Sequence, residues 1–265
     1  MKALLAIEWL KIKRYRTFWI LIGFFIVLLP LWNYEISSGM IKMGGNEKGG
    51  INLLSQAYSF PSVWGNVGFW GSIFIIFLSI LTIILTTNEF AYRTHRQNVI
   101  DGWNRMQFYH AKVGLVLLLS LLATIYLFIN GALFGITQSG SASGMFDRAE
   151  QLFYFFLLSL DYLGLALFIS LWIKRSGLAI GIFMLYCMIL ENLVTGLLNW
   201  STSTKMGNFL PLQASDELLP FPLIKMASAM FKQTTVPESA YVITTIIWCA
   251  IYYFAGRRML QRRDW

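Results

Sequence analysis

Six long apolar stretches alternate with polar segments along this chain of 265 residues, and they restrict its fold more than any other feature. A helix needs roughly 20 mostly apolar residues to cross a hydrocarbon layer about 30 Å thick, where the backbone must satisfy its own hydrogen bonds. The composition agrees, because 57% of the residues are hydrophobic and only 13% are charged. The sequence therefore predicts an all-α membrane protein with a single transmembrane domain over 1–265 and six transmembrane helices near 17–33, 66–87, 113–136, 152–173, 178–198 and 239–256.

Lysine and arginine residues are divided unevenly between the two sides of such a protein. Of the 21, 15 lie near the two chain ends, between the second and third stretches, or between the fourth and fifth. The cytoplasmic loops of membrane proteins carry an excess of these residues. We therefore expect both termini and residues 88–111 to be cytoplasmic. The net charge of +8 then orients the chain in the membrane and does not indicate nucleic-acid binding.

The segment LLAIEWLKIKRYR, before the first stretch, mixes apolar and basic residues with helical spacing. This pattern is typical of an amphipathic helix that lies in the headgroup plane. It is equally typical of a plain positive anchor ahead of the first span. The fold prediction uses the first interpretation, an N-terminal interfacial helix.

The segment 199–238 lies on the outer side in this topology. It carries Pro211, Pro220, Pro222 and Pro237 among many apolar residues. Such a segment is too apolar for an ordinary solvated loop. Irregular backbone can enter a membrane where protein covers it. We therefore predict an outer re-entrant segment between the fifth and sixth spans.

The segment 88–111 contains both histidines of the chain and a dense set of charges. Asp101-Gly102 is a turn signal, and Asn104 is a residue type that caps helix N-termini. These signals divide the segment into the end of the second span, a short helix near 95–100, a break, and a capped entry into the third span. A short helix on the cytoplasmic surface is suited to docking a partner.

The sequence NEFAYRTHRQNVIDGWNRMQFYHAK resembles the part of type-2 permeases of ATP-binding-cassette (ABC) transporters that lies between their second and third spans. The shared residue types are here Glu89, Thr94, Val99-Ile100, Gly102, Asn104, Arg105 and Lys112. Arg93 departs from the glycine of many relatives, and Asn104 replaces the usual serine. The six spans, the interfacial helix, the cytoplasmic termini and the proline-containing outer segment also fit. The resemblance thus covers essentially the whole chain.

The resemblance implies a permease subunit of an ABC exporter in the bacterial inner membrane. Its partners are a second permease copy or a paralogue, two ATPase subunits, and membrane lipid. ATP and Mg²⁺ bind to the ATPase subunits, so this chain needs no cofactor. The short cytoplasmic helix then couples the ATPase to the spans, and Glu89 is paired to Arg93 or Arg105. The coupling residues are Glu89, Arg93, Thr94, Arg96, Val99, Ile100, Gly102 and Arg105. The outer segment forms a gate through Leu210, Pro211, Leu212, Leu219 and Phe221.

Two other functional classes need comparison with this one. An intramembrane enzyme would need a nucleophile, a metal cluster or a carboxylate pair at depth. The acidic residues well inside the predicted spans are Asp161 and Glu191, and the motifs HExxH and GxxxxGK[ST] are absent. We therefore expect no enzymatic activity on this chain, and we expect the two acids to be either structural or substrate-facing. A membrane sensor or immunity protein without transport is the other alternative. The sequence does not identify the transported substrate.

Overall fold

The computed structural model describes residues 13, 15–38, 58–92, 104–202, 204–221 and 236–262. Within these ranges the chain forms helices and no strand. The prediction of six spans is confirmed, because these ranges contain six helical stretches that are long and apolar enough to cross a membrane. They are Arg16–Ser37 (α2), Val63–Ala91 (α4), Arg105–Ser139 (α6), Glu150–Ile173 (α7), Ser176–Thr202 (α8 to α9) and Glu238–Arg262 (α12).

Two predicted elements fall outside the described residues. These are the N-terminal interfacial helix and the short helix near 95–100. The capped entry into the third span is described and confirmed. Asn104 caps α6, with its side chain accepting from the Met106 N–H at 3.4 Å and its own N–H donating to Gln107 Oε1 at 2.8 Å. This cap lets α6 begin eight residues before the predicted span at 113.

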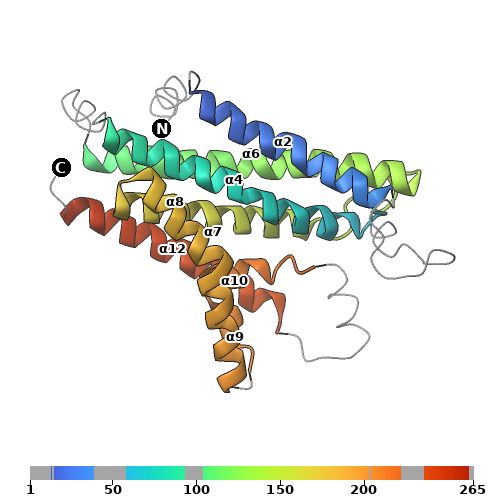
Figure 1. Ribbon diagram of the computed structural model, residues 1–265. Helices are drawn as coiled ribbons and strands as arrows, with labels where there is room; N and C mark the ends of the chain where they lie inside the picture. Colours follow the sequence, from blue (N-terminus) through green and yellow to red (C-terminus); the bar gives the residue numbers. More distant parts are fainter. Residues whose placement is uncertain are drawn as a thin grey trace.

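Helices α4 and α7 form the centre of the bundle. α2 packs against α4, α6 packs against both central helices, and α12 packs mainly against α7. Figure 1 shows that α2 and α6 start at the same end of the bundle at which α4, α7 and α12 finish. This common end contains the flanks of the segment 93–103. We call it the junction end.

The outer faces of the bundle are apolar. On α6, for example, Leu121 is 49% exposed, Leu122 is 52% exposed and Ile129 is 48% exposed. On α2, Ile20 and Val27 are more than half exposed. Isolated soluble proteins rarely expose continuous apolar surfaces of this extent. These faces are therefore suited to contact with lipid tails, and the chain is a multi-pass membrane protein.

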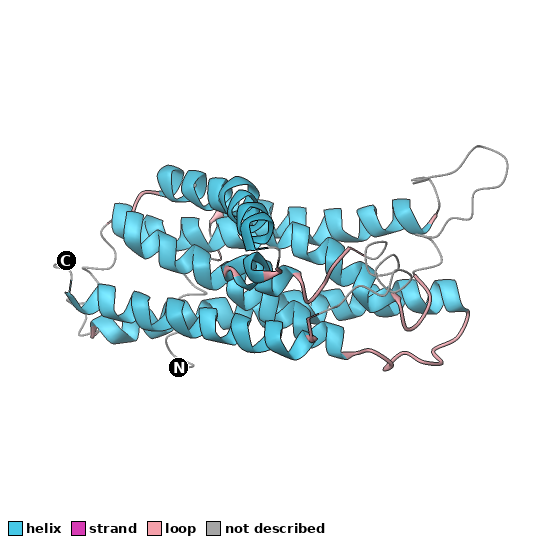
Figure 2. Ribbon diagram, turned by 90° about the horizontal axis from the view of Figure 1, so that it is seen from below, coloured by secondary structure: helices cyan, strands magenta, loops and turns pink. Residues whose placement is uncertain are grey.

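The fifth span is bent. A π-helical turn, Tyr186–Leu190 (η1), separates α8, Ser176–Leu185, from α9, Glu191–Thr202. α9 points away from the bundle in Figure 1, and Figure 2 is viewed along it. Glu191 is the buried residue of α9, whereas Leu197 is 61% exposed and Trp200 is 82% exposed. The sequence predicted a single apolar stretch here, and no proline marks the bend.

Two short helices follow α9 and return toward the bundle. They are the 3₁₀ helix Met206–Phe209 (η2) and the α-helix Pro211–Asp216 (α10). Pro211 occupies the first turn of α10, where its missing N–H costs nothing and its fixed φ favours the helix. α10 packs against α7 and α12.

Candidate functional site

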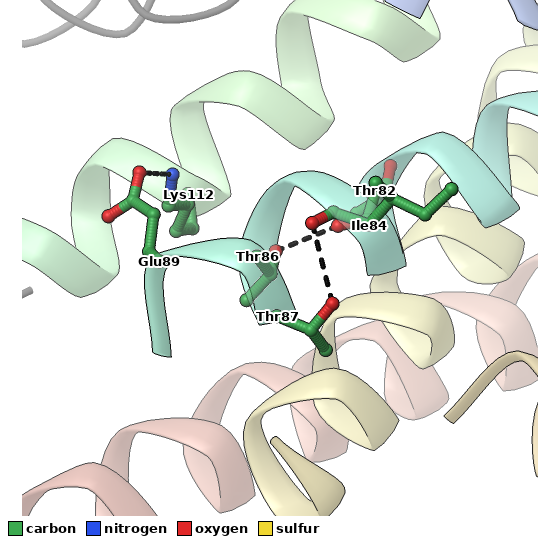
Figure 3. Close-up of polar contacts among 6 residues, drawn as sticks. All are labelled: Thr82, Ile84, Thr86, Thr87, Glu89 and Lys112. Carbon is green, nitrogen blue, oxygen red and sulfur yellow. Dashed lines mark hydrogen bonds and ion pairs between the residues drawn. The ribbon is translucent and has the colours of Figure 1, made fainter. Parts of the chain in front are cut away.

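An ion pair between two spans lies at the junction end. Lys112 Nζ on α6 is 2.6 Å from Glu89 Oε1, near the end of α4 (Figure 3). The Lys112 side chain is 1% exposed and that of Glu89 is 8% exposed. An ion pair shielded from water in this way is costly to break, because either partner alone would be a buried charge.

Aromatic rings and a second lysine surround this ion pair. Lys112 Nζ lies 5.6 Å from the centroid of the Phe108 ring, and the Phe108 and Phe90 rings pack edge to face. Lys174, the residue that ends α7, places its Nζ 5.1 Å from the Phe90 ring. Both lysine distances suit cation–π attraction. We call Glu89, Phe90, Phe108, Lys112 and Lys174 the junction cluster; it joins α4, α6 and α7.

Further polar contacts hold the other helices at the same end. Asn88 on α4 donates to the Tyr15 hydroxyl at 2.9 Å, just before α2 begins. Tyr109 on α6 donates to the Tyr253 carbonyl of α12 at 2.7 Å. These contacts connect the flanks of the segment 93–103 to α2, α7 and α12.

The last turns of α4 also carry threonines. Thr86 donates to the Thr82 carbonyl at 2.8 Å, and Thr87 lies 3.4 Å from the Ile84 carbonyl (Figure 3). Thr87 also donates to the Ile83 carbonyl, at 2.7 Å. These hydroxyls are buried and satisfied within their own helix. The last turns of α4 can therefore pack closely against their neighbours without leaving these hydroxyls unpaired.

The predicted coupling residues are only partly described. Glu89 and Arg105 lie in described helices, the first buried and the second exposed at the start of α6. Arg93, Thr94, Arg96, Val99, Ile100 and Gly102 lie outside the described residues. The pairing of Glu89 with Lys112 was missed, because sequence spacing pointed to Arg93 or Arg105. The signal was present, since Lys112 stands at the edge of a long apolar run where a charge needs a partner.

Away from the junction end, Glu191 connects the bent fifth span to α10. Its Oε1 accepts the backbone N–H groups of Leu212 at 2.6 Å and Gln213 at 3.1 Å, in the first turn of α10. A carboxylate at a helix N-terminus satisfies donors that have no partner within the helix and complements the helix dipole. Gln213 also donates to Asn192 Oδ1 at 3.0 Å. α9 thereby holds α10 in place.

The other end of α10 is held by α7, and the preceding η2 is held by α12. Tyr162 on α7 donates to the Asp216 carboxylate at 3.0 Å. Trp248 on α12 donates to the Phe209 carbonyl at 3.1 Å. Tyr162 lies 12 residues after Glu150, which corresponds to about 18 Å along a helix that rises ~1.5 Å per residue. α10 therefore contacts α7 well inside the bundle, away from the end at which α7 begins.

The five predicted gate residues lie in this described part of the outer segment. Pro211, Leu212 and Leu219 are buried, and Leu210 and Phe221 are half-buried. Leu219 packs over Gly68 of α4, where an added Cβ would lie 3.1 Å from its side chain. The Phe221 ring is 5.0 Å from that of Phe69. Burial raises the pKa of Glu217, just after α10, and Lys205 lowers it.

Asp161 and Glu191 make different contacts. Asp161 is fully buried on α7, with Cys249 Sγ of α12 at 4.0 Å. In the part of the chain that the structure describes, Asp161 Oδ2 and Glu191 Oε2 have no hydrogen-bond partner. The same described ranges contain no group of three His, Cys, Asp or Glu residues arranged to hold a metal ion. The geometry gives Glu191 a structural contact and gives Asp161 a place between two spans.

Comparison with known proteins adds to this geometry. The family described as "ABC-2 family transporter protein" matches residues 4–190, more than two thirds of the chain. The match includes the junction cluster and the first four spans. None of the curated proteins compared with the chain matches it. The match and the six apolar helices agree with the resemblance found in the sequence: this chain belongs to the ABC-2 family of transporter proteins.

Proposed function

We propose that this chain is the permease subunit of an ATP-driven exporter, in which two ATPase subunits act on a pair of permease subunits. The observation that supports coupling most directly is the junction cluster. The segment 93–103 begins two residues after Ala91, the last residue of α4, and ends just before Asn104, the cap of α6. Its two flanks are joined by the buried ion pair of Glu89 and Lys112.

The junction cluster determines how a force on this segment would spread. A displacement of the segment cannot separate α4 from α6 without exposing or breaking the ion pair. Lys174 extends the connection to α7, and Tyr109 extends it to α12. ATPase subunits that pull or push on the segment therefore act on the whole junction end at once. This is the mechanical property that a coupling site needs.

The proposed location is the bacterial inner membrane, with the junction end in the cytoplasm. The distribution of lysine and arginine supports this orientation, since Arg105, Lys174, Arg175, Arg257 and Arg258 all lie toward that end. ATP and Mg²⁺ then bind to the partner ATPases on the cytoplasmic side. The present chain supplies the path and the docking segment.

We further propose that η2, α10 and the residues that follow them form a re-entrant gate at the outer side. Three features support this proposal: the distance of α10 from the outer end of α7, the burial of Leu212 and Leu219, and the Glu191 cap. A helix of six residues is too short to span the membrane, so it needs protein contacts at this depth. Opening the path would require displacement of these contacts.

The second permease subunit is proposed to lie against the fifth span. α9 turns away from its own bundle and exposes Leu193, Leu197 and Trp200. An apolar helix that leaves its own bundle is better packed when another chain covers it. A second copy and a paralogue would both satisfy this requirement.

The coupling proposal is tested by a variant that keeps the junction folded but removes its charges. In Glu89→Gln/Lys112→Met the two side chains retain their approximate size and lose the ion pair. We expect the ATPase to co-purify as it does with the parent chain, while its rate of ATP hydrolysis no longer changes on assembly with the permease. A second variant, Ile100→Asp, should reduce co-purification more than tenfold, a factor that corresponds to about 1.4 kcal/mol.

Matched controls separate these effects from general damage. Gln97→Asp adds the same charge as Ile100→Asp at a position that is already polar, and should leave co-purification unchanged. Normal regulation of hydrolysis in Glu89→Gln/Lys112→Met would contradict the coupling role of the junction cluster. A chain from which no ATPase can be co-purified would favour the sensor alternative.

A further inference from the structure

A cavity of about 160 Å³ lies between α6, α7 and α12. α6 and α12 meet at Tyr109 and Gly256, where an added Cβ on the glycine would lie 2.9 Å from the Tyr109 hydroxyl. Away from this contact the two helices leave room over α7. The floor of the cavity includes Gly164, whose missing side chain deepens it. An added Cβ there would have only the Tyr252 ring within 4 Å, at 3.5 Å.

The walls of the cavity are mostly apolar. They include Val113 and Val116 of α6, Leu167 of α7, and Cys249 of α12. A further lining residue, Leu117, is 43% exposed and stands at the rim. One turn farther along α6, Leu121 is 49% exposed on the outer face of the bundle. The rim therefore adjoins a surface that contacts lipid tails.

Along the bundle, the cavity lies close to the junction end. Val113 lies eight residues after Arg105, which corresponds to about 12 Å from the start of α6. Between the cavity and that end, the His110 ring stacks on the Tyr253 ring, with His110 Nε2 at 3.2 Å from the Tyr253 hydroxyl. Arg257 follows Tyr253 by one helical turn and is exposed. An apolar cavity thus lies below an aromatic layer and an exposed cation.

We propose that this cavity binds one acyl chain of a membrane phospholipid whose phosphate group lies against Arg257. An apolar cavity of about 150 Å³ is large enough to hold benzene, so several methylene groups fit in the present one. The lining contains no charged side chain, and its polar groups are the hydroxyls of three tyrosines and the Cys249 thiol. Arginine, in contrast, matches the geometry and charge of phosphate. This inference is independent of the proposed coupling and gate.

The test uses the full chain in a mild detergent and phosphatidylglycerol with a photoreactive diazirine in the middle of one acyl chain. After irradiation, peptide mass spectrometry should find the label on Val113 to Leu117 and on Cys249 to Tyr253. Gly164→Phe fills the cavity and should reduce this labelling at least fivefold. Gly181→Phe is the matched control. Gly181 is an exposed residue of α8, which does not line the cavity, and an added Cβ there would have no atom within 4 Å.

The position of the phosphate is tested by Arg257→Gln, with Arg262→Gln as control for a cation farther along the exposed end of α12. We expect Arg257→Gln to require a several-fold higher lipid concentration for half-maximal labelling, without moving the labelled residues. If Gly164→Phe does not fold, as judged by size-exclusion chromatography, Leu117→Trp at the rim takes its place and should reduce labelling likewise. Labelling that is unaffected by the filling variant, or spread equally to Leu121, would overturn the proposal.

Discussion

Glu89 and Lys112 illustrate at the scale of single residues how a buried charge is tolerated. Each side chain alone would be an ionised group in an almost dry place, with a cost of several kcal/mol. Together they form a short contact that the Phe108 ring covers on one side. The pair therefore contributes little net stability relative to an apolar pair, and its effect is to determine which residues meet.

This reasoning predicts an asymmetry between single and double variants. Lys112→Met should lower the free energy of unfolding by about 3–5 kcal/mol, because the buried Glu89 carboxylate would lose the ammonium group at 2.6 Å. The double variant Glu89→Gln/Lys112→Met should recover most of that loss. Thermal unfolding of the purified chain in detergent measures both. A single variant as stable as the double would contradict this role of Lys112.

Exposed lysines provide the control for this comparison. Lys205, which precedes η2, is exposed. Lys205→Met removes the same charge and adds the same side chain, and should change the free energy of unfolding by less than about 1 kcal/mol. The contrast with Lys112→Met isolates the effect of burial.

At the scale of elements, the spans follow from sequence periodicity and length, whereas their connections do not. Asn104 was predicted as the cap of the third span, because the chemistry of a cap is local. The π-helical turn at Tyr186–Leu190 and the Glu191 cap on α10 were not predicted. Both depend on contacts between residues far apart in the sequence. Sequence periodicity cannot show such contacts. Neither the π-helical turn nor the Glu191 cap has a distinctive residue pattern.

The Glu191 cap leads to a prediction about α10. Glu191→Leu removes the acceptor of the Leu212 and Gln213 N–H groups, and loss of a cap typically costs about 0.5–2 kcal/mol. We expect these two amides to exchange hydrogen at least several-fold faster, while amides in the middle of α4 stay unchanged. Hydrogen exchange measured by mass spectrometry is the readout.

A conservative variant and a control make this prediction specific. Glu191→Gln keeps an oxygen acceptor without the charge, and should give intermediate exchange. Glu150→Gln, at the exposed start of α7, should leave the exchange of α10 at the parental rate. Slow exchange in Glu191→Leu would show that the packing of Leu212 alone holds α10.

At the scale of the whole molecule, the first residue of α2 and the last residue of α12 both lie at the junction end (Figure 1). An even number of spans requires this arrangement. The predicted topology had the same property. Arg148 lies in the connection between α6 and α7, at the opposite end of the bundle, and Lys205 lies between α9 and η2. The six long apolar stretches thus predicted the number of spans, and the distribution of charges predicted an orientation that biochemical labelling can test.

The orientation predicts opposite labelling of the two ends. In a chain with Cys187 and Cys249 replaced by alanine, single cysteines at Ser143 and Thr204 should react with an impermeant maleimide in intact cells. A cysteine at Arg258 should react only after the membrane is opened. All three parental positions are exposed, so access depends on the side of the membrane. Labelling of the Arg258 variant in sealed cells would reverse the orientation.

The ion pair of the junction cluster also has a consequence for biosynthesis. Glu89 and Lys112 lie on successive spans, 23 residues apart in the chain. The ribosome completes α4 before α6, so Glu89 reaches the insertion machinery without its partner. A lone ionised side chain next to hydrocarbon is unfavourable. We therefore expect α4 and α6 to enter the bilayer together as a helical hairpin, and the final turns of α4 to be integrated only after Lys112 has been translated.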